Sequence, residues 1–250
     1  MSEFSAGLSV LPIKPDTNIR KLKRPINPIL PDVSNGQTGL FIGKIKSGKS
    51  VLLNNFYLRD EFYGNLFDSI YIISNSIYND SSSRFLRDAP NVNCYDSYDD
   101  SLIQGIIDSH SDYEKNSQPL ISIVADDILG SLGKNAKLFQ LFTRSRHYNI
   151  GNLVILTQMF KAVPPAVRNN LTYLVLFWNN FNESELDKIN DEYGHFVGGR
   201  LLALYKEHIL YEPYAFMYIN FENGIVYKNF DTIIHQNTRE YMEKFNKKKE

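Results

Sequence analysis

The fold is decided by one stretch of sequence, Gly43-Lys44-Ile45-Lys46-Ser47-Gly48-Lys49-Ser50. It has the phosphate-loop pattern, in which a glycine is followed by four residues and then by Gly-Lys-Ser or Gly-Lys-Thr. Glycines at both ends let such a loop curl until its backbone N–H groups point inward at phosphate oxygens. The apolar run 38–42 predicts a buried strand before the loop, and the spacing of apolar residues over 49–59 predicts an amphipathic helix after it.

The last two residues of the pattern carry the chemistry. Lys49 is predicted to reach the β- and γ-phosphates of a nucleotide, and the hydroxyl of Ser50 is predicted to bind Mg²⁺. The helix that begins there adds the positive end of its dipole to the anion site. The ligands that the sequence predicts are therefore ATP and Mg²⁺.

A second part of the site is predicted after the apolar run 120–125, which ends in Asp126 and Asp127. Ligands of parallel sheets bind at the carboxyl ends of the strands, where these acids would stand. Asp126 is expected to hold Mg²⁺, and Asp127 to orient the attacking water or accept its proton. Many such hydrolases carry Glu at the second position, so which carboxylate is the base stays open. The alternative is that the pair only caps the next helix.

The run 153–157 predicts another strand and is followed by Gln158. That glutamine is expected to contact both the γ-phosphate and the lytic water, although it could also be a surface residue that caps a loop. Arg144, Arg146 and Arg168 are candidates for a guanidinium that reaches the γ-phosphate of a neighbouring subunit. Each could instead form an ordinary surface ion pair, and the pattern alone does not choose among them.

The predicted strands, including 69–74 and 173–177, are continuously apolar rather than alternating. This is typical of strands that are covered on both faces, so we predict an α/β fold with a mostly parallel sheet flanked by helices. Asn223-Gly224 lies between two strand-like runs and predicts a C-terminal β-hairpin. Helices are expected at 99–109, 136–143, 183–193 and 200–208.

We expect three segments: a proline-rich N-terminal arm (1–36), a P-loop ATPase domain (37–238) and a charged C-terminal tail (239–250). The arm contains the basic cluster 20–24, which could contact a polyanion or a partner subunit, or could simply be solvated. Whether the arm folds back on its own domain or reaches a neighbour stays open at this point.

Composition sets outer limits. The 250 residues carry a formal net charge of −1, and 43% of them are hydrophobic, which is ordinary for a globular domain. The single cysteine, Cys94, excludes a disulfide scaffold. No apolar run approaches the roughly 18–20 residues that span a bilayer, so no membrane span is expected. The five histidines lack the spacing of metal ligands, and no zinc site is proposed.

Because the net charge is near zero, any contact with DNA must come from local groups of basic residues. The candidates are the segment 134–137 and Lys161, both of which could equally be solvated lysines. Six aromatic residues near the C-terminus could be a base-stacking surface, but their alternation fits a hairpin packed on the core better: Tyr205, Tyr211, Tyr214, Phe216, Tyr218 and Phe221.

The order of these motifs resembles the FtsK–HerA superfamily of ring motors, and most closely the genome-packaging ATPases of large DNA viruses and virophages. The similarity runs from about residue 38 to residue 177 and includes Arg146-His147-Tyr148-Asn149 before the strand that ends at Gln158, and Arg168-Asn169 after it. Lys44 and Lys46 make the loop more basic than is usual there.

The resemblance implies a P-loop NTPase of the RecA-like (ASCE) class that assembles into a pentamer or hexamer. It implies translocation of double-stranded DNA into a preformed capsid, a capsid or portal-vertex partner, and a setting in the host cytoplasm, the viral factory or the virion. It assigns the roles given above to Lys49, Ser50, Asp126, Asp127 and Gln158. It also favours Arg146 as the arginine that acts on a neighbour, with Arg144 and Arg168 as alternates.

Other functions share parts of this pattern. A helicase that acts on single strands shares the same core. The absence of a second motor domain in these 250 residues counts against it but does not exclude a ring helicase. A small-molecule kinase also uses a phosphate loop, but the adjacent acids and Gln158 favour hydrolysis. A nucleotide-gated scaffold would not need the complete set of Lys49, Ser50, Asp126 and Asp127.

Overall fold

The computed structural model describes residues 22–111, 113, 118–133, 136–178 and 183–236. Their strands form one nine-stranded sheet in the order β3-β2-β4-β5-β1-β6-β7-β8-β9. The strands are β1 (Gln37–Ile42), β2 (Ser69–Ser74), β3 (Val92–Tyr95), β4 (Ile121–Asp126), β5 (Ile150–Thr157), β6 (Tyr173–Phe177), β7 (Phe216–Asn220), β8 (Ile225–Lys228) and β9 (Thr232–Gln236). From β3 to β6 neighbouring strands are parallel, and from β6 to β9 they are antiparallel.

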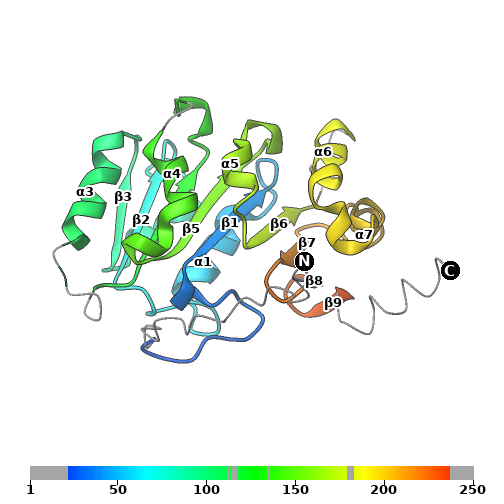
Figure 1. The fold of residues 1–250 in the computed structure, drawn as a ribbon, viewed down its shortest axis with the longest axis horizontal. Helices are drawn as coiled ribbons and strands as arrows, with labels where there is room; N and C mark the ends of the chain where they lie inside the picture. Colours follow the sequence, from blue (N-terminus) through cyan, green and yellow to red (C-terminus); the bar gives the residue numbers. More distant parts are fainter. Residues whose placement is uncertain (1–21, 112, 114–117, 134–135, 179–182, 237–250) are drawn as a thin grey trace, which may run out of the picture.

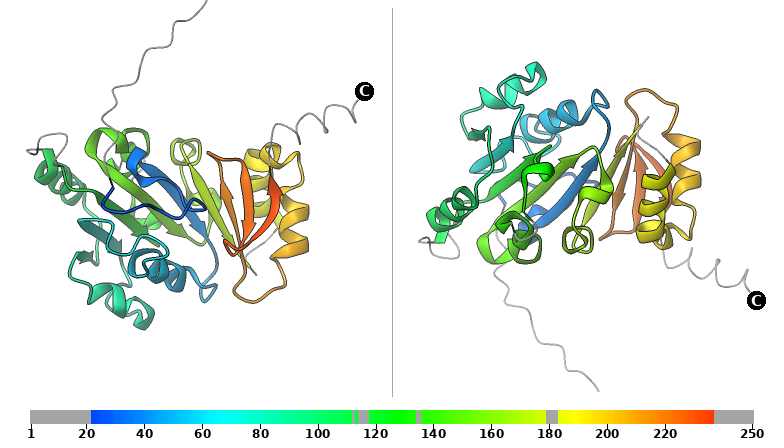
Figure 2. Two further views of the ribbon diagram at one scale, coloured as in Figure 1. Left: turned by 90° about the horizontal axis from the view of Figure 1, so that it is seen from below. Right: turned by 90° about the horizontal axis from the view of Figure 1, so that it is seen from above.

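Helices cover both faces of the sheet (Figure 1). They are α1 (Lys49–Leu58), α2 (Arg84–Arg87), α3 (Asp100–Ser111), α4 (Lys137–Arg144), α5 (Pro165–Arg168), α6 (Glu183–Tyr193) and α7 (Leu201–His208). One core lies between the sheet and α3 to α7, and the other lies between the sheet and α1. Figure 2 shows the antiparallel end of the sheet, orange to red, beside α6 and α7. The predicted α/β class, with a mostly parallel sheet flanked by helices, is confirmed.

The central strands are buried along their whole length, as their continuous apolar sequence predicts. The close approach of β1 and β6 depends on Gly39, because a Cβ there would lie 2.2 Å from the Tyr173 ring. The predicted strands 69–74 and 173–177 and the predicted helix 183–193 agree with the structure at both ends. The other predicted strands and helices differ from it by one to three residues at one or both ends.

The predicted C-terminal hairpin is present as β7 and β8, and the structure extends it by a third strand, β9. Four elements were not predicted from the sequence: β3, β9, α2 and α5. All four are short, and β3 and β9 are the two edge strands of the sheet. An edge strand has one pairing partner and is partly exposed, so its sequence lacks the continuous apolar run of a central strand.

The described part of the predicted arm, residues 22–36, packs against the domain. Leu30 and Val33 are buried in the core on the α1 side, and the Tyr63 hydroxyl donates a 2.8 Å hydrogen bond to the Pro31 carbonyl. The segment ends in a 3₁₀ turn, Val33–Asn35, that leads into β1. These contacts place residues 22–36 on their own domain. The rest of the arm and the predicted tail from residue 239 lie outside the described residues.

Candidate active site

The phosphate loop connects β1 to α1 in a tightly curled conformation. Lys46 and Gly48 both have positive φ, at 64° and 111°. A Cβ on Gly43 would lie 2.3 Å from Ser47 Oγ and 2.9 Å from Phe177 Cβ, so only glycine fits there. The Ser47 amide donates to the Lys44 carbonyl at 3.2 Å, which closes the turn. The predicted strand–loop–helix context of the pattern is therefore present.

Lys49 lies at the centre of this loop. Its Nζ donates to the Gly43 carbonyl at 2.5 Å and to the Lys44 carbonyl at 3.0 Å. Burial lowers the pKa of this amine, and the nearby carboxylates of Asp126 and Asp127 partly oppose that shift. The hydrogen bonds of this ammonium go to neutral carbonyl oxygens. A phosphate oxygen is an anionic and therefore stronger acceptor, so the ammonium can readily exchange its carbonyl partners for phosphate oxygens.

The loop also leaves one polar atom unsatisfied. Ser47 Oγ is buried and has no hydrogen-bond partner among the described residues. A buried hydroxyl without a partner is costly, and the cost disappears when a ligand supplies the missing hydrogen bond. With the inward curl of the loop and the start of α1, this fits an anion at the cradle.

Asp126 ends β4 and faces the loop from the neighbouring part of the sheet edge. Its Oδ2 accepts a 3.2 Å hydrogen bond from the Ser74 hydroxyl at the end of β2. Burial raises the pKa of Asp126 to about 6, although the charge of Lys49 acts in the opposite direction. A partly desolvated carboxylate is suited to hold a cation, because the cation supplies the charge that the protein environment lacks.

Asp127 turns away from the strand direction, with φ at +51°, and its amide donates to the Leu156 carbonyl of β5 at 3.1 Å. This turn aims the carboxylate at the end of β5, where Gln158 Nε2 donates to Asp127 Oδ2 at 3.1 Å. The structure therefore joins the two residues that the sequence assigned to the lytic water. It brings Lys49, Asp126, Asp127 and Gln158 together at one edge of the sheet.

Sequence reasoning missed Asp80, which lies in the polar loop after β2. Its carboxylate accepts hydrogen bonds from the Ser82 amide at 2.9 Å and from the Ser83 hydroxyl at 3.1 Å. The Ser50 hydroxyl also hydrogen-bonds it. Burial alone would raise the pKa of Asp80, but these hydrogen bonds together hold it below its ordinary value.

Asn54 fastens the Asp80 loop to the first turns of α1. Its Nδ2 donates to the Ser50 carbonyl at 2.9 Å and to the Ser82 carbonyl at 2.6 Å. The negative charge of Asp80 also reaches Asp126, whose pKa it raises. The predicted magnesium ligands Ser50 and Asp126 thus have a further carboxylate beside them, that of Asp80. No recognisable motif in the Asn- and Ser-rich loop indicated it.

The donor set suits magnesium rather than a metal that needs many protein ligands. Among the described residues, no group of three or more His, Cys, Asp or Glu side chains is arranged to hold a metal ion. Mg²⁺ usually takes one or two protein ligands and completes its shell with water and substrate phosphates. Ser50 and Asp126 fit that role.

Two of the three candidate arginines are exposed, and the third is not. Arg144 and Arg146 are exposed at the end of α4 and in the turn that follows it. Arg168 is buried, pairs with Glu192 at 3.2 Å, and has its guanidinium 4.9 Å from the Phe160 ring centroid. Arg168 therefore has a packing role within its own subunit, while Arg144 and Arg146 point to solvent.

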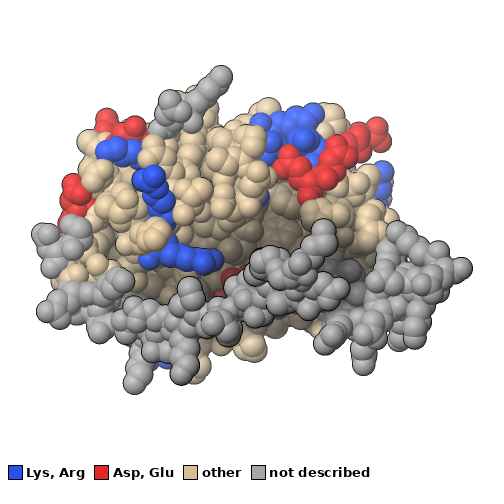
Figure 3. Space-filling model, in the orientation of Figure 1, with Lys and Arg blue, Asp and Glu red and all other residues tan. Residues whose placement is uncertain are grey.

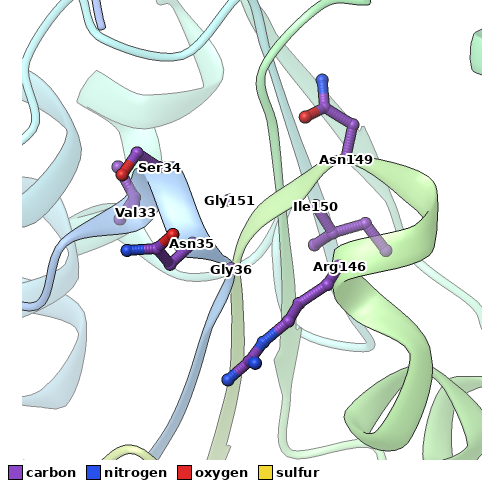
Figure 4. A pocket seen from close by; sticks show the side chains of 8 residues that line it. All are labelled: Val33, Ser34, Asn35, Gly36, Arg146, Asn149, Ile150 and Gly151. Carbon is purple, nitrogen blue, oxygen red and sulfur yellow. The ribbon is translucent and has the colours of Figure 1, made fainter. Parts of the chain in front are cut away.

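Arg146 lies at a cavity of about 160 Å³ (Figure 4). The cavity is lined by the turn before β1 and the turn before β5: Val33, Ser34, Asn35, Gly36, Arg146, Asn149, Ile150 and Gly151. This is the amino edge of the sheet, whereas the phosphate loop follows the carboxyl end of β1. Six residues of strand separate the two edges by roughly 20 Å. Arg146 is thus too far from its own phosphate loop to touch a nucleotide bound there.

The predicted DNA-contacting lysines that the structure describes are engaged within the domain. Lys137 Nζ donates to Gln104 Oε1 at 2.8 Å, and Lys161 Nζ donates to Ser184 Oγ at 3.0 Å. Lys134 lies outside the described residues. On the face seen in Figure 3, Lys and Arg side chains lie in small separate groups, some with acidic side chains beside them.

The described part of the basic cluster fastens the N-terminal segment to the domain. Lys23 pairs with Asp68 at 2.5 Å, and Arg24 donates to the carbonyls of Phe62 and Gly64 at 2.9 and 2.8 Å. For Lys23 and Arg24 these contacts within the domain are neither of the two alternatives that the sequence left open, contact with a polyanion or partner subunit and simple solvation. Arg20 and Lys21 lie outside the described residues.

The part of the chain with a described structure holds no helix of the length and apolar character needed to cross a membrane.

A family described as "Poxvirus A32 protein" matches residues 39–197, more than half of the chain. The search among curated proteins found no match to the sequence. Among solved structures, the DNA-packaging ATPase B204 of Sulfolobus turreted icosahedral virus is similar, with a TM-score of 0.56 at 16% identity over 82% of this chain and 100% of that one. The genome-packaging NTPase B204 of Sulfolobus turreted icosahedral virus 2 in complex with ATP-gammaS has a TM-score of 0.54 at 14% identity, over 78% and 96% of the two chains. At these identities the structural likeness concerns the fold.

Proposed function

This chain belongs to the poxvirus A32 protein family, and from that premise we propose that it is a viral genome-packaging ATPase, which hydrolyses ATP and uses the free energy to translocate double-stranded DNA into a preformed capsid. The observation that carries the proposal is the convergence of Lys49 and Asp126 with the hydrogen-bonded pair Asp127–Gln158 at one sheet edge. The structurally similar viral NTPases are genome-packaging proteins, which agrees with this proposal.

In this proposal the phosphate loop binds the triphosphate of ATP. Lys49 exchanges its carbonyl partners for β- and γ-phosphate oxygens, and the Ser47 hydroxyl gains the hydrogen bond that it lacks. Both changes give better hydrogen-bond partners to polar groups that are poorly satisfied without ligand. Nucleotide binding therefore removes part of the free-energy cost of burying these groups.

Mg²⁺ would be held by Ser50 and Asp126, and when bound it neutralises the negative charge that accumulates on the phosphates. In this proposal Asp127 accepts a proton from the attacking water. Gln158 holds that carboxylate by its amide and can also contact the water, which keeps the base oriented for an in-line attack.

In this proposal the guanidinium near the γ-phosphate comes from another molecule, since Arg146 lies at the opposite edge of its own sheet and Arg168 is engaged internally. We propose a ring, a pentamer or hexamer, in which each nucleotide lies between two subunits, and the position of Arg146 away from its own phosphate loop is compatible with such an arrangement. Arg146 is the first candidate for the residue that acts on a neighbour, and Arg144 is the alternate.

The remaining partners follow from the proposed activity. They are double-stranded DNA, contacted mainly through phosphates, and a capsid or portal-vertex protein on which the ring assembles. The corresponding setting is the host cytoplasm or the viral factory, or the virion itself.

The proposal is tested by steady-state ATP hydrolysis with and without long double-stranded DNA, with Lys49→Ala as the blank. We expect turnover that requires Lys49 and increases when duplex DNA is added. Turnover that depends on Lys49 but ignores duplex DNA would contradict translocation, and turnover equal in the wild type and in Lys49→Ala would contradict the assignment of the site.

A further inference from the structure

The residues of the site fix the direction in which a bound nucleotide must lie. Asp126 ends β4, and Asp127 and Gln158 come directly after β4 and β5, which lie on one side of β1 in the sheet. They mark the γ-phosphate end, because the metal and the lytic water act there. On the other side of β1 lie β6 and β7. The ribose and base must therefore extend toward the ends of those two strands.

The end of β6 touches the phosphate loop directly. A Cβ on Gly48 would lie 3.6 Å from Phe177 Cε1, and one on Gly43 would lie 2.9 Å from Phe177 Cβ. The next residue, Trp178, donates its amide to the Ala215 carbonyl at 2.9 Å. That bond places the turn between α7 and β7 at the same edge of the sheet as the loop.

Tyr214 lies in this turn and packs against Trp178, with ring centroids 5.7 Å apart and planes at 64°. Since β7 is two strands away from β1, the turn lies about 10 Å along the sheet edge from the end of β1. A ribose and a base attached to phosphates in the loop can cover that separation.

Two features distinguish Tyr214, its exposure and its backbone conformation. Its side chain is 69% exposed, and its backbone has φ at +65°, a region that a bulky residue rarely adopts. The turn is fastened by an ion pair between Glu212 and Lys228 of β8. A strained residue that presents an aromatic ring to solvent beside a ligand site is a candidate for a ligand contact.

We propose that Tyr214, supported edge-to-face by Trp178, is the platform on which the base of the bound nucleoside triphosphate stacks. This inference rests on the proposed function, since it requires that the phosphate loop bind a nucleotide. Stacking uses the π-face that every base has, and an exposed tyrosine ring supplies it without hydrogen bonds.

The chain offers a direct reporter and a matched control. Trp178 is its only tryptophan, so tryptophan fluorescence reports on the ring beneath the proposed platform. Tyr211 lies three residues before Tyr214 in the same turn region and is 86% exposed, and no aromatic partner is recorded for it among the described residues. Replacing Tyr211 removes an exposed tyrosine ring from the same turn region, as replacing Tyr214 does, but leaves the proposed platform intact.

The experiment titrates the full chain with ATP or with inorganic tripolyphosphate in the presence of Mg²⁺, followed by Trp178 fluorescence and by calorimetry. Both ligands can occupy the phosphate loop, but only ATP carries a base. We expect ATP to change the Trp178 emission and tripolyphosphate to leave it unchanged. Tyr214→Asn, which tolerates the left-handed backbone, should weaken ATP binding about tenfold and leave tripolyphosphate binding unchanged. Tyr214→Phe and Tyr211→Asn should bind ATP like the wild type.

Two results would overturn the platform while the proposed function stands. One is Lys49-dependent ATP binding that Tyr214→Asn does not weaken, and the other is an emission change by tripolyphosphate as large as that by ATP. A wild type that binds neither ligand overturns the proposed function, and the platform with it.

Discussion

Gln158 Nε2 donates a 3.1 Å hydrogen bond to Oδ2 of Asp127, and this bond joins the ends of β5 and β4. Asp127 reaches it because its backbone turns into the left-handed region immediately after β4. The two residues are 31 positions apart in the chain and act as one unit in the folded domain. The proposed catalytic base is therefore oriented by a side chain of the neighbouring strand.

We expect Gln158→Ala to lower kcat for ATP hydrolysis by about 10²-fold while the Kd for ATP stays within about threefold, because the variant loses orientation of the base and water and no phosphate ligand. Single-turnover hydrolysis and calorimetry measure the two quantities. Gln140→Ala, a change of an exposed glutamine on α4, is the matched control. A fall in ATP affinity as large as the fall in kcat would contradict this role for Gln158.

We expect the ionised carboxylate of Asp126 to lower the stability of the fold while being required for ATP hydrolysis. Burial raises its pKa to about 6, so the folded chain binds a proton more tightly than the unfolded chain between about pH 4 and pH 6. Stability from this group is therefore lost as the pH rises through that window. At pH 8 Asp126→Asn should increase the free energy of unfolding by about 1–3 kcal/mol and abolish hydrolysis. Urea denaturation at pH 4.5 and pH 8 checks this, and a variant that is less stable at pH 8 would show that the carboxylate is net stabilising.

The same pKa predicts the pH dependence of magnesium use. A protonated Asp126 is a poor ligand, so the Mg²⁺ concentration needed for half-maximal ATP binding should rise as the pH falls below about 6. Calorimetric titrations of ATP at graded Mg²⁺ between pH 5 and pH 8 measure it. In Asp126→Asn this dependence should disappear.

Asp80 should add to magnesium binding, because its carboxylate lies beside Ser50 and within electrostatic reach of Asp126. Asp80→Asn retains an oxygen that can accept from the Ser82 amide, so the loop keeps that contact. We expect the half-saturating Mg²⁺ concentration to rise about fivefold. Asp88→Asn removes the same charge from an exposed ion pair and should leave it unchanged. If both variants behave like the wild type, Asp80 only caps its own loop.

Arg146 and Arg168 should give opposite results. Arg168→Ala leaves Glu192 without its buried partner and uncovers Phe160, so the free energy of unfolding should fall by about 2 kcal/mol. Lys188→Ala removes a more exposed partner of the same Glu192 and should cost less than about 1 kcal/mol. Arg146→Ala should leave stability unchanged within about 0.5 kcal/mol, because the residue is exposed, and should abolish hydrolysis.

A mixing experiment shows whether Arg146 acts on a neighbour. Lys49→Ala and Arg146→Ala are each expected to be inactive alone. When they are combined, some interfaces pair an intact phosphate loop with an intact Arg146, and a part of the hydrolysis should return. No recovery, in rings shown to contain both variants, would exclude a contribution of Arg146 to a neighbouring site.

The central part of the fold follows from the sequence because each signal there is strong. The phosphate loop has a fixed pattern, and the strands beside it are continuous apolar runs that only a doubly covered sheet accommodates. The acids and Gln158 follow those runs directly, so a parallel sheet brings them to one edge. The hydrogen bond between Gln158 and Asp127 could not be predicted from the sequence, because it depends on the positive φ of Asp127.

Several features could not be predicted from the sequence, because they depend on tertiary contacts of irregular segments or lie at the sheet edges. Asp80 lies in a loop of Asn and Ser residues whose position is set by Asn54, 26 residues earlier, through hydrogen bonds that no periodicity records. Residues 22–36 have prolines that exclude regular structure, and only the burial of Leu30 and Val33 shows that they belong to the core. β3 and β9 are edge strands with weak apolar patterns.

The central claim is that ATP hydrolysis at this site moves the protein along double-stranded DNA. Displacement of a short triplex-forming strand from a long linear duplex measures that movement directly, with Lys49→Ala and Gln158→Ala beside the wild type. We predict that the wild type displaces the strand in the presence of ATP and Mg²⁺, at a rate that depends on the length of duplex leading to the triplex, and that both variants fail. ATP hydrolysis by the wild type on the same duplex without displacement would contradict the account.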